Sequence, residues 1–441
     1  MREHYLRRVV WLGLLLTSIH SAFGQSHVIL RAPAESVPAI ASRHGLTVEC
    51  APNVEGISCA LTSDSRTPDQ VVTELSADPD VQHAEVDLDV PIPERSSGFQ
   101  PNPQTNAVQN AMGSQTPVSY FGGSVWTSYV NQAATALTHV ANAQGIPATG
   151  VGIVAVIDTG VDPGQPVLKA SLVPGYDFVN GIAGIPSEWG DLDQATAAVL
   201  NQATAGDTPV QLNQSTAAIL DQSTAAILDV TRVPAAFGHG TMIAGIIHLV
   251  APTAQIMPLK AFKGDGTANL SDIVRAVYYA VDNGARVINM SFNLTGPSVE
   301  LMKALNYATA HGVICVSSAG NDGAETVVYP AAYHNVIGVA STDNLDNRSS
   351  FSNYGAALAT IAAPGEGIIT TYPGGNYAVV SGTSFSAPFV AAAASMMVQV
   401  DGDVVPTEAL AAFSNAKKLT SDLGFGRLDL FQSVRSLIAY H

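Results

Sequence analysis

Ser384 is the residue of this chain with the clearest potential for nucleophilic chemistry. It lies in the stretch 382–388, between a strand-like run that ends at Val380 and the apolar run 389–400. A strand, a glycine turn and a helix place this serine at a helix N-terminus, where backbone N–H groups and the helix dipole stabilise an oxyanion. A hydroxyl held there is a candidate nucleophile. The alternative is that Thr383 or Ser384 only caps the helix.

Three further residues could assist such a serine. Asp158 ends the predicted buried strand 150–157, and α/β sheets place their sites at the carboxyl ends of strands. His239 lies between two glycines at a predicted helix start, and a neutral imidazole is a suitable general base at about pH 7. Asn321 follows the predicted strand 313–317 and could donate to an oxyanion. The alternatives are turn roles for Asp158 and Asn321 and a structural role for His239.

The order of predicted elements indicates how these residues are brought together. Strands alternate with helices, which is typical of a parallel sheet covered on both faces. We therefore predict an α/β fold, a three-layer α/β/α sandwich with a mainly parallel sheet. The predicted strands are 150–157, 255–260, 287–291, 313–317 and 336–340, and the predicted helices are 126–142, 270–283 and 299–311.

The residues before this region form a separate small unit. Its predicted order is β-α-β-β-α-β, a ferredoxin-like pattern, and it could be an independent module or a pro-segment. Cys50 and Cys59 flank a turn-rich stretch and could pair in an oxidising compartment. Cys315 lies in a buried-looking strand and is interpreted as an inert thiol. The predicted strands are 27–30, 46–50, 56–61 and 81–90, and the predicted helices are 38–44 and 67–75.

Composition and the N-terminus indicate a secreted protein. The chain has 441 residues, a formal net charge of -17 and 12% charged residues, which argues against a nucleic-acid partner. Residues 1–24 combine arginines, the apolar run 9–16 and small residues, which is the pattern of a signal peptide. The apolar run is short for a membrane span, so we expect no membrane association after its removal, with an uncleaved anchor as the alternative.

Four segments follow from these patterns: a signal peptide (1–24), the ferredoxin-like unit (25–93), a linker with a processing site (94–123) and the main domain (124–441). The linker is rich in Pro, Gln, Asn and Ser, and we expect it to be open to proteolysis. An eight-residue motif recurs four times within 193–228. Four copies are too few to indicate a solenoid, and we interpret them as a surface insertion without an assigned function.

The candidates stand in the order Asp158, His239, Asn321, Ser384, and their motifs resemble those of subtilisin-like (subtilase) serine peptidases. The resemblance covers roughly residue 126 to the C-terminus. It implies that Ser384 is the nucleophile, that His239 is the general base and that Asp158 orients the imidazole. Asn321 and the Ser384 backbone N–H would stabilise the oxyanion. The matching motifs are Asp158-Thr159-Gly160, His239-Gly240-Thr241, Ala319-Gly320-Asn321 and Gly382-Thr383-Ser384-Phe385-Ser386-Ala387-Pro388.

The resemblance also implies a substrate site. Ser291, Phe292 and Asn293 match the segment that pairs with the substrate backbone and forms one wall of the P1 pocket. Val328 matches a position of the pocket floor that is often Gly, so we expect a shallow pocket that favours medium apolar side chains over Phe or Tyr. Asp322 at the rim would add tolerance for a basic side chain. The remaining substrate-binding candidates are Ser318, Ala319 and Gly320.

The unit 25–93 resembles the inhibitory propeptide of the family. This implies a zymogen, secreted as a monomer, whose own propeptide is an intramolecular inhibitor and whose substrates are proteins or peptides. Met242 stands where the family usually has a second, non-catalytic His. The loop that carries a strong calcium site in many relatives is missing near Gly245, so we predict no cofactor and no metal ligand, with the acidic turn 343–346 as a place for weak calcium binding.

Two other functions stay open at this point. One is a catalytically silent, secreted peptide-binding protein on the same scaffold, against which the intact Asp158, His239, Asn321 and Ser384 argue. The other is a related acid peptidase of the sedolisin type with a Glu as base, against which His239 and Asn321 argue. The sequence thus favours a secreted serine endopeptidase.

Overall fold

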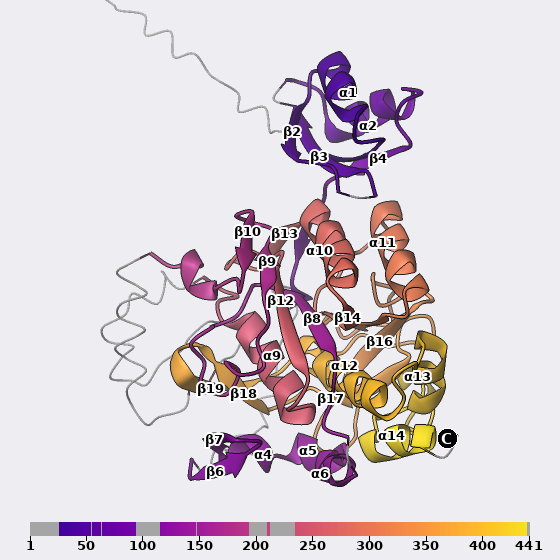
Figure 1. Cartoon of the computed structure of the whole chain (residues 1–441). Coiled ribbons are helices and arrows are strands. Elements are labelled where there is room, and N and C mark those ends of the chain that lie inside the picture. The colour runs from indigo at the N-terminus through magenta and orange to yellow at the C-terminus, as the bar shows by residue number, and fades with distance from the viewer. Residues whose placement is uncertain are drawn as a thin grey trace, which may run out of the picture. The chain divides into compact units, whose positions relative to one another are not determined.

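The computed structural model describes residues 26–53, 55–62, 64–93, 115–146, 148–193, 210–211 and 234–438. They belong to two compact units, Met1–Val86 and Asp87–His441 (Figure 1). The predicted signal peptide, linker residues 94–114 and the repeats within 194–209 and 212–228 lie outside the described residues.

The first unit has the β-α-β-β-α-β order expected from the sequence. Its antiparallel sheet has the strand order β2-β3-β1-β4. Cys50 and Cys59 are cross-strand partners, and their sulfurs form a disulfide. The elements are β1 (Ser26–Arg31), α1 (Val37–His44), β2 (Thr47–Cys50), β3 (Ile57–Thr62), α2 (Pro68–Ser76) and β4 (His83–Val86).

Local sequence signals explain the second helix of this unit. The Thr67 side chain accepts a hydrogen bond from the Gln70 backbone N–H, and the Gln70 side chain accepts one from the Thr67 N–H. This reciprocal capping box satisfies two donors that a helix start leaves open. Val71 and Leu75, four residues apart, are fully buried on one helical face. They pack in a core with Val28 and other strand residues.

An eight-stranded sheet forms the centre of the second unit. Its strand order is β10-β9-β12-β8-β14-β15-β16-β17, and every described pair is parallel except β10 with β9. This confirms the mainly parallel sheet. The strands are β8 (Ile153–Asp158), β9 (Gly175–Asp177), β10 (Ile182–Gly184), β12 (Gln255–Lys260), β14 (Ala285–Met290), β15 (Ile314–Ser318), β16 (Val336–Thr342) and β17 (Ile361–Pro364).

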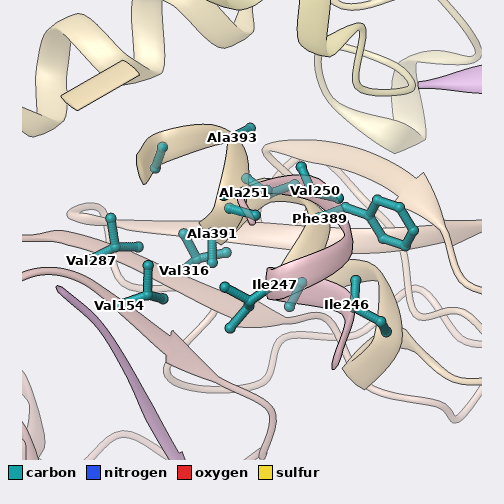
Figure 2. Packing of buried hydrophobic residues seen from close by; sticks show 14 of the residues in the cluster. Val154, Ile246, Ile247, Val250, Ala251, Val287, Val316, Phe389, Ala391 and Ala393 are labelled. Atoms are coloured by element: carbon teal, nitrogen blue, oxygen red, sulfur yellow. The ribbon is translucent and has the colours of Figure 1, made fainter. Parts of the chain in front are cut away.

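Helices cover both faces of this sheet, as predicted. Helices α9 (His239–Val250) and α12 (Thr383–Val400) pack together on one face, where they meet Val154 and Val316 of the strands (Figure 2). Helices α10 (Leu270–Asp282) and α11 (Val299–Ala310) pack together on the other face (Figure 1). Helix α12 is apolar and long enough to cross a membrane, but 89% of it is buried in this core. Helices α13 (Pro406–Phe413) and α14 (Leu430–Ile438) follow it.

The predicted helix 126–142 is helical over most of its length but is not one continuous helix. Three short helices replace it, because the chain leaves helical geometry between them: His139 has a φ of 58°, and Gln132 is extended. The Gln132 side chain donates to the carbonyls of Tyr129 and Ile369, so contacts with a distant strand override the local helix preference. The helices are α4 (Thr127–Val130), α5 (Ala133–Leu137) and α6 (Val140–Gly145).

Shorter elements complete the second unit. β6 (Pro117–Tyr120) and β7 (Gly123–Trp126) form a hairpin, so residues 117–123 of the predicted linker are structured. The predicted strand 81–90 is divided into β4 and β5, which belong to different units. The other elements are β5 (Asp89–Pro91), η2 (Glu188–Asp191), β11 (Val210–Gln211), β13 (Thr267–Asn269), β18 (Ile368–Tyr372), η4 (Pro373–Gly375), β19 (Asn376–Val380) and η5 (Ser421–Leu423).

Candidate active site

Ser384 lies in the first turn of α12, as the glycine turn after a strand predicted. Gly382 is the N-cap and has no side chain to cap with, so the interpretation of Thr383 or Ser384 as a simple cap is wrong. The Ser384 side chain is buried, and its Oγ has no hydrogen-bond partner among the described residues. The hydroxyl is therefore held at a helix start without a hydrogen bond to the described residues.

A proline in α12 explains how the backbone of Ser384 is supported. Pro388 has no N–H, so the usual helical hydrogen bond to the Ser384 carbonyl cannot form. The hydroxyl of Ser291 donates to that carbonyl instead, at 3.1 Å, and Asn289 Nδ2 donates to Ser291 Oγ at 3.0 Å. The sequence assigns Ser291 only to substrate binding. The proline four residues after Ser384 is the signal that could have indicated this support.

Asp158 and His239 are brought together by the sheet and by α9. Asp158 is the last residue of β8, His239 is the first of α9, and Nδ1 of the imidazole lies 2.7 Å from Oδ1 of the carboxylate. Both side chains are buried, which strengthens the interaction. Only glycine fits after the histidine, because a Cβ on Gly240 would lie 2.0 Å from the carbonyl oxygen of Gly160. With Nδ1 turned to the carboxylate, Nε2 is the nitrogen that can act as a base.

Asn321 is hydrogen-bonded to Thr383, the residue before Ser384. Its Oδ1 accepts hydrogen bonds from the backbone N–H and the hydroxyl of Thr383, at 2.9 Å and 2.8 Å. The Thr383 hydroxyl also accepts one from the Gly320 N–H, at 3.0 Å. The amide oxygen is thus engaged, and the amide nitrogen is the end with protons to donate. Sequence reasoning missed the role of Thr383, whose hydroxyl links the loop after β15 to the start of α12.

Comparison with known proteins assigns the chain to a family. The model of the subtilase family, Peptidase S8, matches residues 150–428, well over half of the chain. The chain belongs to the subtilase family. Its α/β fold with a mainly parallel central sheet is in keeping with that family.

Individual relatives extend the comparison. Subtilisin BL of Lederbergia lenta is 42% identical over 171 residues, which are 37% of this subtilase and 63% of that protein. Thermitase of Thermoactinomyces vulgaris is 34% identical over 254 residues, 55% of this chain and 74% of thermitase. Fervidolysin of Fervidobacterium pennivorans, a keratinolytic enzyme related to subtilisin, shares the fold with a TM-score of 0.67 at 20% identity, over 94% of this chain and 62% of that one. The subtilase thus spans under two thirds of the first relative's length.

The predicted substrate-binding residues lie on two neighbouring strand ends. Asn293 follows β14, Ser318 ends β15, and Asn293 Nδ2 donates to the Ser318 carbonyl at 2.9 Å. This bond joins the predicted pocket-wall segment after β14 to the end of β15. Val328 is buried and packs with Ala319. The side chain of Phe292 packs against Phe262 and is fully buried, so only its backbone could contact a substrate.

An extended segment at the start of the second unit lies along β13. β5 pairs antiparallel with β13, and the Ile92 N–H donates to the Gly266 carbonyl at 3.0 Å. The Asp87 carboxylate accepts hydrogen bonds from the backbone N–H and the hydroxyl of Ser271, at 2.8 Å and 2.6 Å, and so caps α10. The side chains of Val90 and Ile92 are buried. The segment is bound as an added strand.

The described residues contain no group of three or more His, Cys, Asp or Glu side chains that could hold a metal ion. In the acidic turn 343–346, Asp343 Oδ1 accepts hydrogen bonds from the N–H groups of Leu345 and Asn347. Asp346 forms ion pairs of 2.6 Å with Lys417 and Arg427. Protein donors therefore bind both carboxylates of the turn.

The third cysteine is separate from the site chemistry. Cys315 lies in β15 and is fully buried, and this burial raises the pKa of its thiol to about 12. Burial thus disfavours the thiolate, which is the reactive form of a cysteine, in keeping with the interpretation of Cys315 as an inert thiol.

Proposed function

We propose that this subtilase is a secreted serine endopeptidase that hydrolyses peptide bonds with a Ser384–His239–Asp158 triad and is made as an autoinhibited proprotein. The observation that carries the proposal is the buried 2.7 Å hydrogen bond between His239 and Asp158, together with the family membership of the chain. A serine at a helix start and an amide held beside it supply the remaining groups that acyl transfer requires.

Each residue has one role in the proposed reaction. Ser384 Oγ attacks the peptide carbonyl while His239 Nε2 accepts its proton, and the Asp158 carboxylate stabilises the resulting imidazolium. The oxyanion accepts hydrogen bonds from Asn321 Nδ2 and from the Ser384 backbone N–H. His239 then protonates the leaving amine, and water hydrolyses the acyl-enzyme by the same steps in reverse.

Casein hydrolysis in the presence of a sulfonyl fluoride tests the activity. Phenylmethylsulfonyl fluoride should add one sulfonyl group to Ser384 and abolish hydrolysis, because only an activated serine reacts with it. A protein that cuts no casein, even after limited trypsin cleavage of the linker, and that takes up no sulfonyl group would favour the alternative of a catalytically silent peptide-binding protein.

The first unit and the strand β5 are proposed to form the intramolecular inhibitor. The support is the strand addition of β5 to β13, with the side chains of Val90 and Ile92 buried and Asp87 capping α10. A segment that adds as a strand is held through its main-chain groups, which is a known mode of peptide binding. Cleavage within 94–123 would then release the unit. The signal-peptide pattern of 1–24 supports secretion.

Asn321→Ala should lower kcat by about 10²–10³-fold and leave KM within about twofold, because the amide is proposed to bind the oxyanion and not the ground-state carbonyl. Steady-state kinetics on a fluorogenic peptide measure both constants. Asn335→Ala, which removes an amide from the loop before β16, is the control and should keep both. A variant that raises KM while kcat stays unchanged would contradict the oxyanion role.

Val328→Gly should raise kcat/KM for Phe at P1 by about tenfold relative to Leu, because it removes a buried branched side chain from the proposed pocket floor. A peptide library that varies P1 measures the ratio, and the wild type should prefer Leu and Ala over Phe. Asn293→Gly, which removes the hydrogen bond to the Ser318 carbonyl, should shift the ratio in the same direction. A wild type that prefers Phe would exclude the shallow pocket.

A further inference from the structure

A second carboxylate lies buried beside the Asp158–His239 pair. Glu188, in η2, has 0% of its surface exposed. Its Oε1 accepts hydrogen bonds from the Thr159 hydroxyl at 2.5 Å and from the Gly240 backbone N–H at 3.0 Å. Its Oε2 accepts one from the Thr241 hydroxyl. Each donor is within two residues of Asp158 or His239, so one carboxylate joins both catalytic motifs.

The backbone around Glu188 is hydrogen-bonded to Val161, in the loop that follows Asp158. The Glu188 N–H donates to the Val161 carbonyl at 3.2 Å, and the Val161 N–H donates to the Pro186 carbonyl at 3.0 Å. A Cβ on Gly160 would lie 2.9 Å from the Pro186 oxygen and 3.5 Å from Glu188 Cγ. The glycine therefore permits the close approach that brings the glutamate to Thr159.

The Thr159 hydroxyl has one proton and two carboxylates within reach. Its Oγ1 lies 2.5 Å from Glu188 Oε1 and 3.2 Å from Asp158 Oδ1, and it accepts a hydrogen bond from Gly240. Among the described residues, Asp158 Oδ2 has no hydrogen-bond partner. The hydroxyl proton of Thr159 is therefore the one whose placement changes how well the charge of Asp158 is solvated by the protein.

We propose that Glu188 is a positioning residue for the Asp158–His239 pair: it joins the two motifs and competes with Asp158 for the proton of the Thr159 hydroxyl. An ionised Glu188 keeps that proton, and the Asp158 carboxylate then interacts with His239 and with the Thr159 backbone N–H, which donates to Oδ1 at 2.8 Å. A protonated Glu188 releases it to Asp158, which then stabilises the imidazolium less. The charge of Glu188 also attracts the imidazolium directly, so both effects have the same sign.

The surroundings of Glu188 allow both states near neutral pH. Burial raises the pKa of Glu188 to about 7. The hydrogen bonds from Thr159 and Thr241 favour the ionised form and oppose this shift. Lys260 lowers that pKa and is itself bound to Asp191 at 2.6 Å. The titratable and charged groups that interact with Glu188 are Asp158 from β8, Lys260 from β12 and Tyr372 from β18. His239 from α9 is bonded to Asp158, and Asp191 from η2 is bonded to Lys260.

The first test rests on the proposed peptidase function and uses the processed enzyme. Glu188→Gln keeps the shape of the side chain but removes its charge. In the pH profile of kcat/KM, the midpoint of the acid limb should therefore move to a pH lower by about one unit, and kcat should fall by about tenfold. Glu188→Asp keeps the charge and should leave the acid limb where it is in the wild type. Glu300→Gln removes another fully buried carboxylate, paired with Lys303 on α11, and should change neither quantity.

The second test needs no activity. In the full-length Ser384→Ala protein, the midpoint of the His239 titration, followed by NMR of labelled histidine, should fall by about one pH unit when Glu188→Gln is added. An unchanged midpoint and an unchanged acid limb would overturn the positioning role. A shifted midpoint in a protein that cuts no peptide would overturn the proposed peptidase function alone. If Glu188→Gln does not fold, a shifted acid limb in Glu188→Asp would also overturn the inference.

Discussion

Ser384→Ala is expected to lower kcat by about six orders of magnitude, as loss of the nucleophile does in subtilisin. The substitution removes the only atom proposed to bond to the substrate carbonyl, while the buried helix start around it has room for a methyl group. The wild type should shed about its first hundred residues and hydrolyse casein, whereas Ser384→Ala should keep the mass of the proprotein. Mass spectrometry and the casein assay measure both effects.

A matched serine on the same helix serves as the control for this result. Ser395 is buried in α12, and its hydroxyl donates to the Val151 carbonyl at 2.8 Å, far from the helix start. Ser395→Ala should process itself and cut casein at wild-type rates. If Ser384→Ala still processed itself at more than about one thousandth of the wild-type rate, the serine would not be the nucleophile. A full-length, inert wild type that trypsin activates would instead indicate processing by another protease.

Asp158→Asn should lower kcat by about 10⁴-fold with little change in fold. The carboxylate accepts from His239 Nδ1 at 2.7 Å, and it thereby fixes the tautomer in which Nε2 is free to take a proton. An amide can turn its NH₂ group to Nδ1, which then holds the imidazole in the wrong tautomer. The variant also lacks the negative charge that stabilises the imidazolium.

The measurement compares kcat on a fluorogenic peptide with the temperature of thermal unfolding. Asp177→Asn is the control, because Asp177 is also a buried carboxylate at the end of a strand of the same sheet but binds only Asn180 among the hydrogen bonds described. Its kcat should stay within about twofold of the wild type. A loss of less than about tenfold in Asp158→Asn would mean that His239 does not depend on this carboxylate.

The sequence by itself determined the architecture and the order of the four candidate residues. Runs such as 153–157 and 313–316 are apolar and rich in β-branched residues, and they alternate with segments of helical periodicity. These signals are local, so they can be read without the fold. The parallel sheet follows from that alternation, and a parallel sheet brings strand ends to one edge. Asp158, Ser291 and Asn321 could therefore be predicted as neighbours.

Only the tertiary structure decided which groups support these residues. Glu188 meets Thr159 and Gly240, and Ser291 meets the Ser384 carbonyl, through contacts between segments 29 to 93 residues apart. No pattern of hydrophobicity specifies such pairs, because they depend on how loops close after the sheet has formed. The same reason explains the broken helix at 126–142, where the contact of Gln132 with Ile369 outweighs local propensity. Local propensities therefore determine which segments form helices and strands, whereas long-range packing determines the partners of each buried polar group.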